Sequence, residues 1–391
     1  MPGRRRAARL VLAVALTVAG PAAAQRLVVP IPNEQAVRVV ADSFVGGDGR
    51  FHRVDRYHPA GPAGVRPAVV FVNLIGPVLR TWSIYQEWAR LVTARGMVGV
   101  LYDAPAPPAD RSREVPLAAA DLDSLLATLE RRGPRIGIDP GNVVLWAAST
   151  NTRLGTPVAL ESGGRTVRGY VLYYGSGEVS VPRPDVPVFI ARAGLDTPGL
   201  NRQLDALAAR LIGAGLPVTV VNHPSGPHAF DVMDSSAASA GVIEQTLAFI
   251  RQVTDPATGE SVRRGVPEAV AAAAFAAGRW QDAADGYRRV VAAQPDRGGS
   301  FWRLGLAQLE LGQHRDALGS FERARDLGVS GARDLGVPAA RAAVRAGDPA
   351  RAAEWIKWAL GRFPPLRQEV MADDELGPLL QRPELASPNP A

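Results

Sequence analysis

The chain has 391 residues, of which 47% are hydrophobic and 21% charged, a composition typical of a globular protein long enough for two or three domains. The net charge of +6 comes from arginines scattered among acidic residues. Because there is no basic run with interleaved aromatic residues, the composition gives no support for nucleic-acid binding. The chain has no cysteine, so its domains must be stable without disulfide bonds.

Residues 1–24 are predicted to be a secretory signal peptide. Three arginines at residues 4–6 precede an apolar run of about 14 residues, and Ala22-Ala23-Ala24 forms a small-residue cleavage site. The run is shorter than the roughly 20 residues that cross a bilayer, so an uncleaved membrane anchor is the less favoured alternative. Cleavage would remove the four arginines of this segment and leave a net charge of about +2. We expect an exported protein, periplasmic or secreted, without a membrane anchor.

Residues 25–254 are predicted to form an α/β domain. It begins with two half-buried antiparallel strands, 37–40 and 51–57, joined by a glycine-rich turn. Continuous apolar runs, typical of strands covered on both faces, then alternate with amphipathic helices. The strands are expected at 68–72, 97–103, 142–146, 169–174, 186–191 and 216–221, and the helices at 82–95, 117–131, 200–214 and 240–253. This alternation predicts a doubly wound, mostly parallel sheet, with ligands beyond the carboxyl ends of its strands.

Residues 255–265, rich in Pro, Thr, Gly and Ser, are predicted to be a linker, and residues 266–391 an all-α domain of helical repeats. Three glycines recur at a spacing of about 34 residues, each followed by an alanine and then by a bulky side chain. The three sets are Gly278, Ala283 and Tyr287; Gly312, Ala317 and Phe321; and Gly347, Ala352 and Ile356. This period is typical of tetratricopeptide (TPR) repeats, which would bind a protein or peptide partner. Residues 366–385 are expected to supply a capping helix.

The apolar run before Ser149 ends abruptly on Ala147-Ala148-Ser149-Thr150-Asn151. A buried strand that turns sharply into a helix is how a nucleophile elbow exposes its serine hydroxyl. The usual pattern is Gly-x-Ser-x-Gly, and here Ala147 and Asn151 occupy the glycine positions. Alanine is only a methyl larger than glycine, and asparagine tolerates unusual backbone angles. Ser149 is therefore the candidate nucleophile.

A nucleophilic serine needs a histidine base and a carboxylate that orients it, and in this fold they follow the serine in the order acid, then histidine. His228 comes directly after the last expected strand and is favoured as the base over His223. Asp196 follows the strand at 186–191 and is favoured as the acid over Glu178. An aspartate at this place also fits ordinary turn chemistry.

The backbone N–H groups of Thr150 and of Leu74 or Ile75 are expected to form the oxyanion hole. Aromatic residues are candidate walls of the substrate site, although such residues more often belong to the core. They are Trp82, Tyr174 and Phe230. The sequence contains no metal-ligand cluster, phosphate-binding glycine loop or cofactor motif, so no metal or cofactor is expected.

Residues 67–253 resemble the dienelactone hydrolase branch of the α/β hydrolases. The resemblance rests on the Ser149 elbow, the Gly194-x-Asp196 turn and Pro-x-Gly-Pro-His228-Ala-Phe, which is similar to the family's Pro-Gly-x-x-His-Gly-Phe. It implies the α/β hydrolase fold and a Ser149, Asp196 and His228 triad that cleaves esters or lactones through an acyl-enzyme. The family's enzymes use a cysteine nucleophile, which this chain lacks, so serine chemistry is expected.

Several residues depart from the family pattern next to the expected active site. They are Ala147 and Asn151 in the elbow, Ala229 after the histidine, and Asn73-Leu74 where lipases often carry His-Gly. These departures leave an alternative open, in which the domain is a catalytically inactive scaffold and the chain is a TPR interaction protein.

Overall fold

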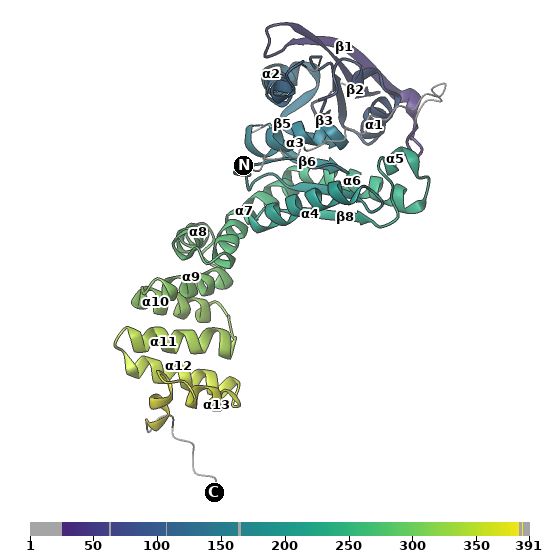
Figure 1. Ribbon diagram of the computed structural model, residues 1–391. Helices are drawn as coiled ribbons and strands as arrows, with labels where there is room; N and C mark the ends of the chain where they lie inside the picture. Colours follow the sequence, from purple (N-terminus) through teal and green to yellow (C-terminus); the bar gives the residue numbers. More distant parts are fainter. Residues whose placement is uncertain (1–25, 62–63, 107, 163–165, 383–384, 386–391) are drawn as a thin grey trace, which may run out of the picture.

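The computed structural model describes residues 26–61, 64–106, 108–162, 166–382 and 385, and of residues 258–264 it describes the backbone only. The expected signal peptide lies outside the described residues. Figure 1 shows a sheet domain, from β1 to α6, followed by a stack of helices that leads away from it. None of the described helices has the length and apolar character needed to span a membrane.

Eight strands form one sheet in the order β1-β2-β4-β3-β5-β6-β7-β8. The strands are β1 (Val37–Val45), β2 (Phe51–Pro59), β3 (Arg66–Phe71), β4 (Val98–Tyr102), β5 (Ile138–Ala148), β6 (Val167–Tyr173), β7 (Val188–Ala193) and β8 (Val218–His223). β2 pairs antiparallel with β1 and with β4. From β4 onward in this sheet order, each strand is parallel to its neighbour. The predicted α/β class with a mostly parallel sheet is confirmed, and the arrangement agrees with the α/β hydrolase fold that the resemblance implied.

Helices cover both faces of the sheet, as a doubly wound fold requires. They are α1 (Ser83–Ala94), α2 (Glu114–Arg132), α3 (Thr152–Pro157), α4 (Pro198–Gly213), α5 (Phe230–Met233) and α6 (Ala237–Thr254). One core cluster joins α2, α3 and α4 to the sheet through residues such as Leu122, Leu154 and Leu204. A second joins α1 and α6 to the other face through Trp88 and Leu247. The central strands are apolar throughout because they are buried between these two layers.

The C-terminal helices pack one after another as antiparallel neighbours (Figure 1). They are α7 (Pro256–Ala276), α8 (Trp280–Ala293), α9 (Gly298–Glu310), α10 (His314–Asp326), α11 (Val337–Arg345), α12 (Pro349–Arg362) and α13 (Leu366–Met371). The recurring glycines Gly278, Gly312 and Gly347 have φ of 69°, 72° and 79° and stand just after α7, α9 and α11. This left-handed conformation favours glycine and ends a helix. Their regular spacing therefore marks the turn inside each helix pair.

The side chains that follow these glycines are the buried contacts of the helix pairs. Ala283, Ala317 and Ala352 are fully buried, and the bulky residues four positions later are no more than 2% exposed. Small side chains let the helices approach, and the bulky ones fill the space between crossings. This packing agrees with helical repeats, while their assignment to the TPR type remains a prediction.

Two sequence predictions for the C-terminal half are wrong. The expected linker, residues 255–265, lies within α7 except for its first residue, so a helix joins the two domains. Pro256 is compatible with this because the first turn of a helix needs no intrahelical N–H donor. The expected capping helix over 366–385 is instead two short pieces, α13 and the 3-10 helix η8 (Gly377–Gln381).

Candidate active site

Ser149 stands at the sharp turn between β5 and the helical segment that follows it. Its φ is 53°, a conformation that non-glycine residues rarely adopt, and the 3-10 turn η5 (Ser149–Asn151) leads directly into α3. Thr152 Oγ1 donates to the carbonyl of Ser149 at 2.6 Å and supports the turn. Strain of this kind persists only where the surrounding structure enforces it, and it commonly marks functional sites. The strand-turn-helix geometry predicted for Ser149 is present.

The first departure from the elbow motif, Ala147, is accommodated by a glycine further along. A Cβ placed on Gly155 of α3 would lie 2.8 Å from the Cβ of Ala147 and 2.8 Å from the hydroxyl of Tyr170. Since real Cβ atoms do not approach so closely, α3 can pack on β5 only because Gly155 lacks one. The methyl gained at Ala147 is thus matched by the methyl missing at Gly155.

The loops after β7 and β8 carry Asp196 and His228 and are tied to each other. The Gly194 N–H donates to the carbonyl of His223 at 2.8 Å, and the Leu195 N–H donates to the carbonyl of Gly226 at 3.0 Å. A side chain on Gly194 would collide with the backbone of Pro224. This close approach fixes the two loops beside each other at the carboxyl edge of the sheet.

The three predicted triad side chains meet within hydrogen-bond distance. His228 Nε2 lies 2.9 Å from Ser149 Oγ, and His228 Nδ1 lies 2.6 Å from Asp196 Oδ2. An ionised carboxylate only accepts, so Nδ1 carries the proton and Nε2 is left to accept from the serine hydroxyl. The Asp196 side chain is 5% exposed and that of His228 is 30% exposed, so the base can be reached from solvent. The arrangement can deprotonate Ser149 for attack on an electrophile.

The alternative residues considered for the triad lie elsewhere. His223 is 2% exposed, and its Nε2 contacts Asp234 Oδ2 at 3.0 Å and Ser239 Oγ at 2.9 Å, which makes it part of a buried network. Glu178 lines a cavity of about 820 Å³ together with Arg153 and other residues of α3, α4 and the segment after β6. Neither contacts Ser149.

The predicted oxyanion donors Leu74 and Ile75 already have acceptors. The Leu74 N–H donates to Asn151 Oδ1 at 2.8 Å, and the Ile75 N–H donates to Asn73 Oδ1 at 3.0 Å. In this structure neither N–H is free to meet a substrate oxygen, and their place in the oxyanion hole stays a prediction. Thr150 stands in the first turn of η5, where backbone N–H groups have no intrahelical acceptor.

Asn151 holds the elbow to the loop after β3, a role that the sequence analysis missed. Its side chain is buried, accepts from Leu74 and donates from Nδ2 to the Tyr85 hydroxyl at 2.8 Å. Its backbone has ordinary right-handed helical angles, so tolerance of unusual angles is not why asparagine stands here. The signal in the sequence was a polar amide at a position that a tight turn normally reserves for glycine.

The three predicted substrate walls differ in exposure. Trp82 is 42% exposed, whereas Tyr174 is 5% exposed and its ring lies 4.8 Å from the His228 ring. Phe230 is fully buried and packs against Tyr173 and Tyr174, so its prediction as a wall is wrong. Its side chain belongs to the core cluster that joins α6 to the sheet.

The buried carboxyl of Asp231 supports the loop that carries His228. Asp231 accepts from the Tyr174 hydroxyl at 2.7 Å and from Trp88 Nε1 at 2.8 Å. Burial raises the pKa of the Asp231 carboxyl above its ordinary value, while these hydrogen bonds and the nearby His228 act in the opposite direction. Asp231 therefore anchors the segment that presents His228.

Outside the triad, one group of potential metal ligands occurs among the described residues. Asp48, His52 and Asp121 each offer a ligand atom, and these atoms lie within 4.8 Å of one another. Asp121 also accepts from the Gly47 N–H at 2.7 Å, so the group joins the β1–β2 turn to α2. The sequence analysis expected no such cluster because Asp121 is distant from the other two along the chain.

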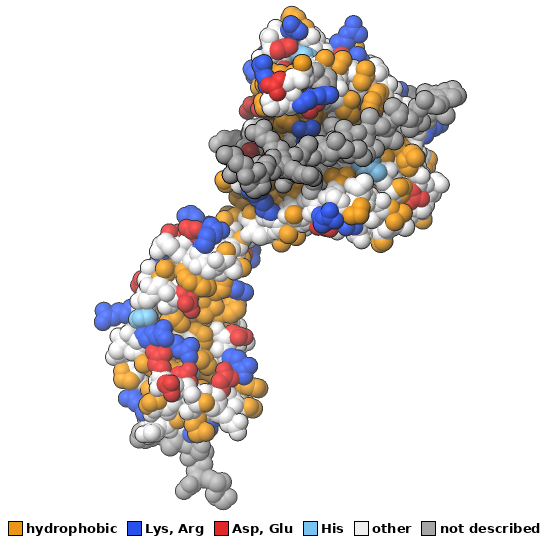
Figure 2. All heavy atoms as spheres, in the orientation of Figure 1, with side chains coloured by type: hydrophobic (Ala, Val, Ile, Leu, Met, Phe, Trp, Pro, Cys, Tyr) orange, Lys and Arg blue, Asp and Glu red, His pale blue; other side chains and the backbone are white. Residues whose placement is uncertain are grey.

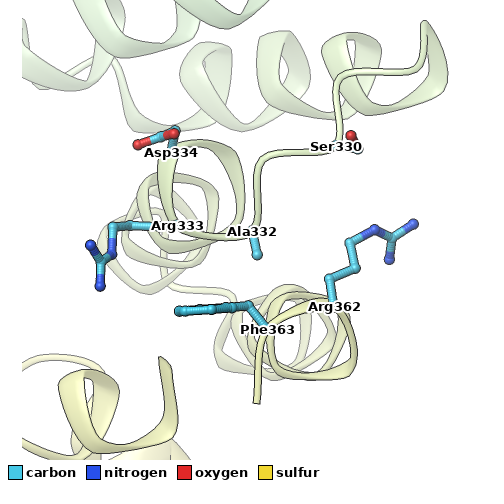
Figure 3. A pocket seen from close by; sticks show the side chains of 6 residues that line it. All are labelled: Ser330, Ala332, Arg333, Asp334, Arg362 and Phe363. Carbon is cyan, nitrogen blue, oxygen red and sulfur yellow. The ribbon is translucent and has the colours of Figure 1, made fainter. Parts of the chain in front are cut away.

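The helical domain contains a cavity of about 650 Å³ between residues 330–334 and the end of α12 (Figure 3). Figure 3 shows the side chains of Arg333 and Arg362 extending to opposite sides of Ala332. The lining includes Ser330 and Asp334 but no histidine, so it offers no counterpart to the serine-histidine pair.

Comparisons with known proteins give likenesses in structure alone. No protein-family model matches the chain, and none of the curated proteins matches it. Similar solved structures include a bacterial heroin esterase, with 17% identity and a TM-score of 0.49 over 56% of this chain and 86% of that chain. Brefeldin A esterase, a bacterial homologue of human hormone sensitive lipase, has 17% identity and a TM-score of 0.48 over 59% of this chain and 81% of that chain. Carboxyl esterase 2 from the fungus Tuber melanosporum has 14% identity and a TM-score of 0.47 over 58% and 89%. At identities and TM-scores this low, these likenesses carry no conclusion about what this chain does.

Proposed function

We propose that this chain is an exported serine hydrolase that cleaves carboxylic esters or lactones through an acyl-enzyme. The observation that carries the proposal is the continuous contact from Ser149 Oγ through the His228 ring to Asp196, at 2.9 and 2.6 Å. The left-handed backbone of Ser149 is a second feature that nucleophile elbows share.

In the acylation step, His228 Nε2 takes the proton of Ser149 as Oγ attacks the ester carbonyl. Asp196 holds the imidazole in the required tautomer and stabilises the imidazolium that forms. His228 then passes the proton to the departing alcohol oxygen as the carbon–oxygen bond breaks. Water, activated by the same histidine, hydrolyses the acyl-serine and restores the free enzyme.

The developing oxyanion would be held by the backbone N–H of Thr150. A second donor requires the Leu74 or Ile75 N–H to exchange its present side-chain acceptor for the substrate oxygen. The loop after β3 would then shift on substrate binding. The dienelactone hydrolase resemblance implies esters or lactones as substrates, and Tyr174, beside His228, would lie next to the bound substrate.

The helical domain is proposed to bind a protein or peptide partner. Figure 2 shows hydrophobic side chains running along one face of this domain between charged ones. Stacked helix pairs commonly use such extended faces for recognition. Export of the protein is proposed from the signal-peptide pattern of residues 1–24.

The function is tested with the purified chain and p-nitrophenyl acetate or butyrate. Ser149→Ala should lower kcat by about 10⁴-fold or more, and Asp196→Asn by about 10³- to 10⁴-fold, with the far-UV circular dichroism unchanged. Glu178→Gln is the matched control for the acid and should leave the rate unaltered. Turnover by wild-type protein no faster than by Ser149→Ala would reject the hydrolase.

One observation favours the alternative of an inactive scaffold, namely that both expected donors after β3 are already occupied. A scaffold that retains the triad without an oxyanion hole would bind a fluorophosphonate slowly or not at all. Rapid labelling mapped to Ser149 would therefore contradict the scaffold, whereas unlabelled protein with intact partner binding would support it.

A further inference from the structure

A basic cavity of about 460 Å³ lies where β1, β2, β3 and the 3-10 helix η4 (Gly133–Ile136) meet. Its lining contains no acidic residue, but it contains four arginines and one histidine. They are Arg38, Arg56, His58, Arg66 and Arg135. We call the cavity that these side chains line the basic cavity.

The sheet register explains why these side chains converge. Arg38 in β1 stands directly opposite His58 in β2, and Val40 stands opposite Arg56. Because side chains two apart in a strand point to the same face, Arg38, Arg56 and His58 share one face of the hairpin. Arg66 begins β3, and its backbone N–H donates to the carbonyl of Gly137, which follows Arg135 and η4 closely.

The positive charge of the basic cavity is largely unbalanced. Arg56 contacts Asp42 at 3.1 Å, but Asp42 is shared with Arg132 at 3.3 Å. Arg38, Arg66 and Arg135 take part in no ion pair in the part of the chain that the structure describes. Burial, together with the neighbouring Arg56, Arg38 and Arg66, lowers the pKa of His58 to about 4, as expected for a group surrounded by like charge.

Arg56, one of the two most buried members of the group, also has one donor atom without an acceptor. Arg56 is 7% exposed, and its Nη1 donates to the carbonyl of Ile136 at 3.2 Å. Its Nε is buried without a hydrogen-bond partner among the described residues. Buried donors are nearly always satisfied in folded proteins, so the protein's own acceptors satisfy this guanidinium only in part.

We propose that the basic cavity binds an anion that carries a phosphate group. Guanidinium groups match phosphate oxygens in a bidentate geometry, and several of them together favour a dianion over a single carboxylate. The volume leaves room for the organic group that bears the phosphate. A soluble phosphate ester and a phospholipid headgroup share this chemistry.

The basic cavity is remote from the triad. β3 and β5 begin beside it, whereas Ser149 follows the other end of β5, which has 11 residues. Because β5 bulges between Ile138 and Val143, which pair with Arg66 and Ala68 of β3, the span is about eight extended residues, or roughly 26 Å at about 3.3 Å per residue. A ligand here would not touch the ester, so this inference stands whether or not the chain is a hydrolase.

The test is titration calorimetry of the full chain with glycerol 3-phosphate and with inorganic phosphate, in a chloride buffer of constant ionic strength. We expect saturable binding to wild-type protein. The exposed pair Arg38→Gln and Arg135→Gln, introduced together, should weaken it by about tenfold or more, because charge-assisted hydrogen bonds are lost. Arg202→Gln on α4, an exposed arginine outside the cavity, is the matched control and should bind as wild type does.

A second arm separates the two sources of phosphate. Co-sedimentation with phosphatidylglycerol vesicles that the double variant abolishes, without binding of glycerol 3-phosphate, would assign the site to lipid headgroups. Binding of the soluble ester alone would assign it to small molecules. Absence of saturable binding in both arms, or equal affinity in wild type and double variant, would overturn the proposal.

Discussion

Asn151 stands where the elbow motif has its second glycine, and its side chain makes two hydrogen bonds that glycine could not make. It connects three separate segments, since Leu74 belongs to the loop after β3 and Tyr85 to α1. The chain has thus replaced a permissive residue with one that fixes the geometry around the nucleophile.

Asn151→Ala should lower the free energy of unfolding by about 2–4 kcal/mol, because a buried N–H and a buried hydroxyl lose their partners. Urea denaturation followed by circular dichroism measures the change. Tyr85→Phe removes only one of the two bonds and should cost about 1 kcal/mol. If both substitutions lowered the free energy of unfolding equally, the contact to Leu74 would contribute nothing to stability.

His58 gives the protein a dependence of stability on pH. Its pKa is about 4 in the folded protein and about 6.5 when unfolded, so between these values only the unfolded chain binds the proton. The contribution of His58 to the free energy of unfolding is therefore complete above about pH 6.5. It is lost as the pH falls toward 4, by about 1.4 kcal/mol per pH unit at most.

The measurement compares wild type with His58→Gln across pH 4–7 in a buffer without phosphate. The free energy of unfolding of wild type should fall more steeply with acidification than that of the variant. Parallel curves would mean that His58 is protonated equally in the folded and unfolded states.

At the scale of elements, the contact between α3 and β5 depends on one missing methyl group. Gly155→Ala should destabilise the protein by about 1–3 kcal/mol through overpacking against Ala147 and Tyr170. Ala147→Gly in the same molecule should recover part of this loss, which a double-mutant cycle measures. Gly199→Ala in α4, with nothing within 4 Å of the added Cβ, is the control and should be neutral or slightly stabilising. Strict additivity would argue against the Ala147–Gly155 contact.

The elements of the sheet domain could be predicted because their signals are local. Apolar runs and helical periodicity depend on neighbouring residues, and the residues after strand ends identified Ser149, Asp196 and His228 as neighbours in space. The occupied N–H groups of Leu74 and Ile75 could not be predicted, because their acceptors are side chains that reach them only in the folded protein. Phe230 was misplaced for the same reason, since burial depends on what packs over it.

At the scale of the whole molecule, composition misled the prediction of a linker. Pro, Thr, Gly and Ser favour a loop in isolation, but α7 is held by contacts with α6 and α8 that a local reading does not include. Gly215, in the turn before β8, shows how close this contact is. An added Cβ would lie 2.7 Å from the carbonyl oxygen of Ala269 in α7.

Gly215→Ala should therefore lower the free energy of unfolding by more than the positive φ of this residue alone explains. Gly96 has a similar φ of 89°, with nothing within 4 Å of an added Cβ, so Gly96→Ala measures the conformational penalty, about 1–2 kcal/mol. The excess at Gly215, about 1–3 kcal/mol, would report the clash with α7. Equal losses in thermal or urea unfolding would mean that α7 moves aside without cost.

α7 contacts both α6 of the sheet domain and α8 of the helical array. The first helix pair of the array therefore has the sheet domain as its neighbour on one side. A stack of similar helix pairs has two ends, each able to accept another copy of the same surface. Here α6 and the Gly215 turn occupy one end, and α13 with η8 occupies the other. The end beside the sheet domain is thereby covered by a surface unlike another helix pair, and this cover would be lost if the array were produced without its neighbour.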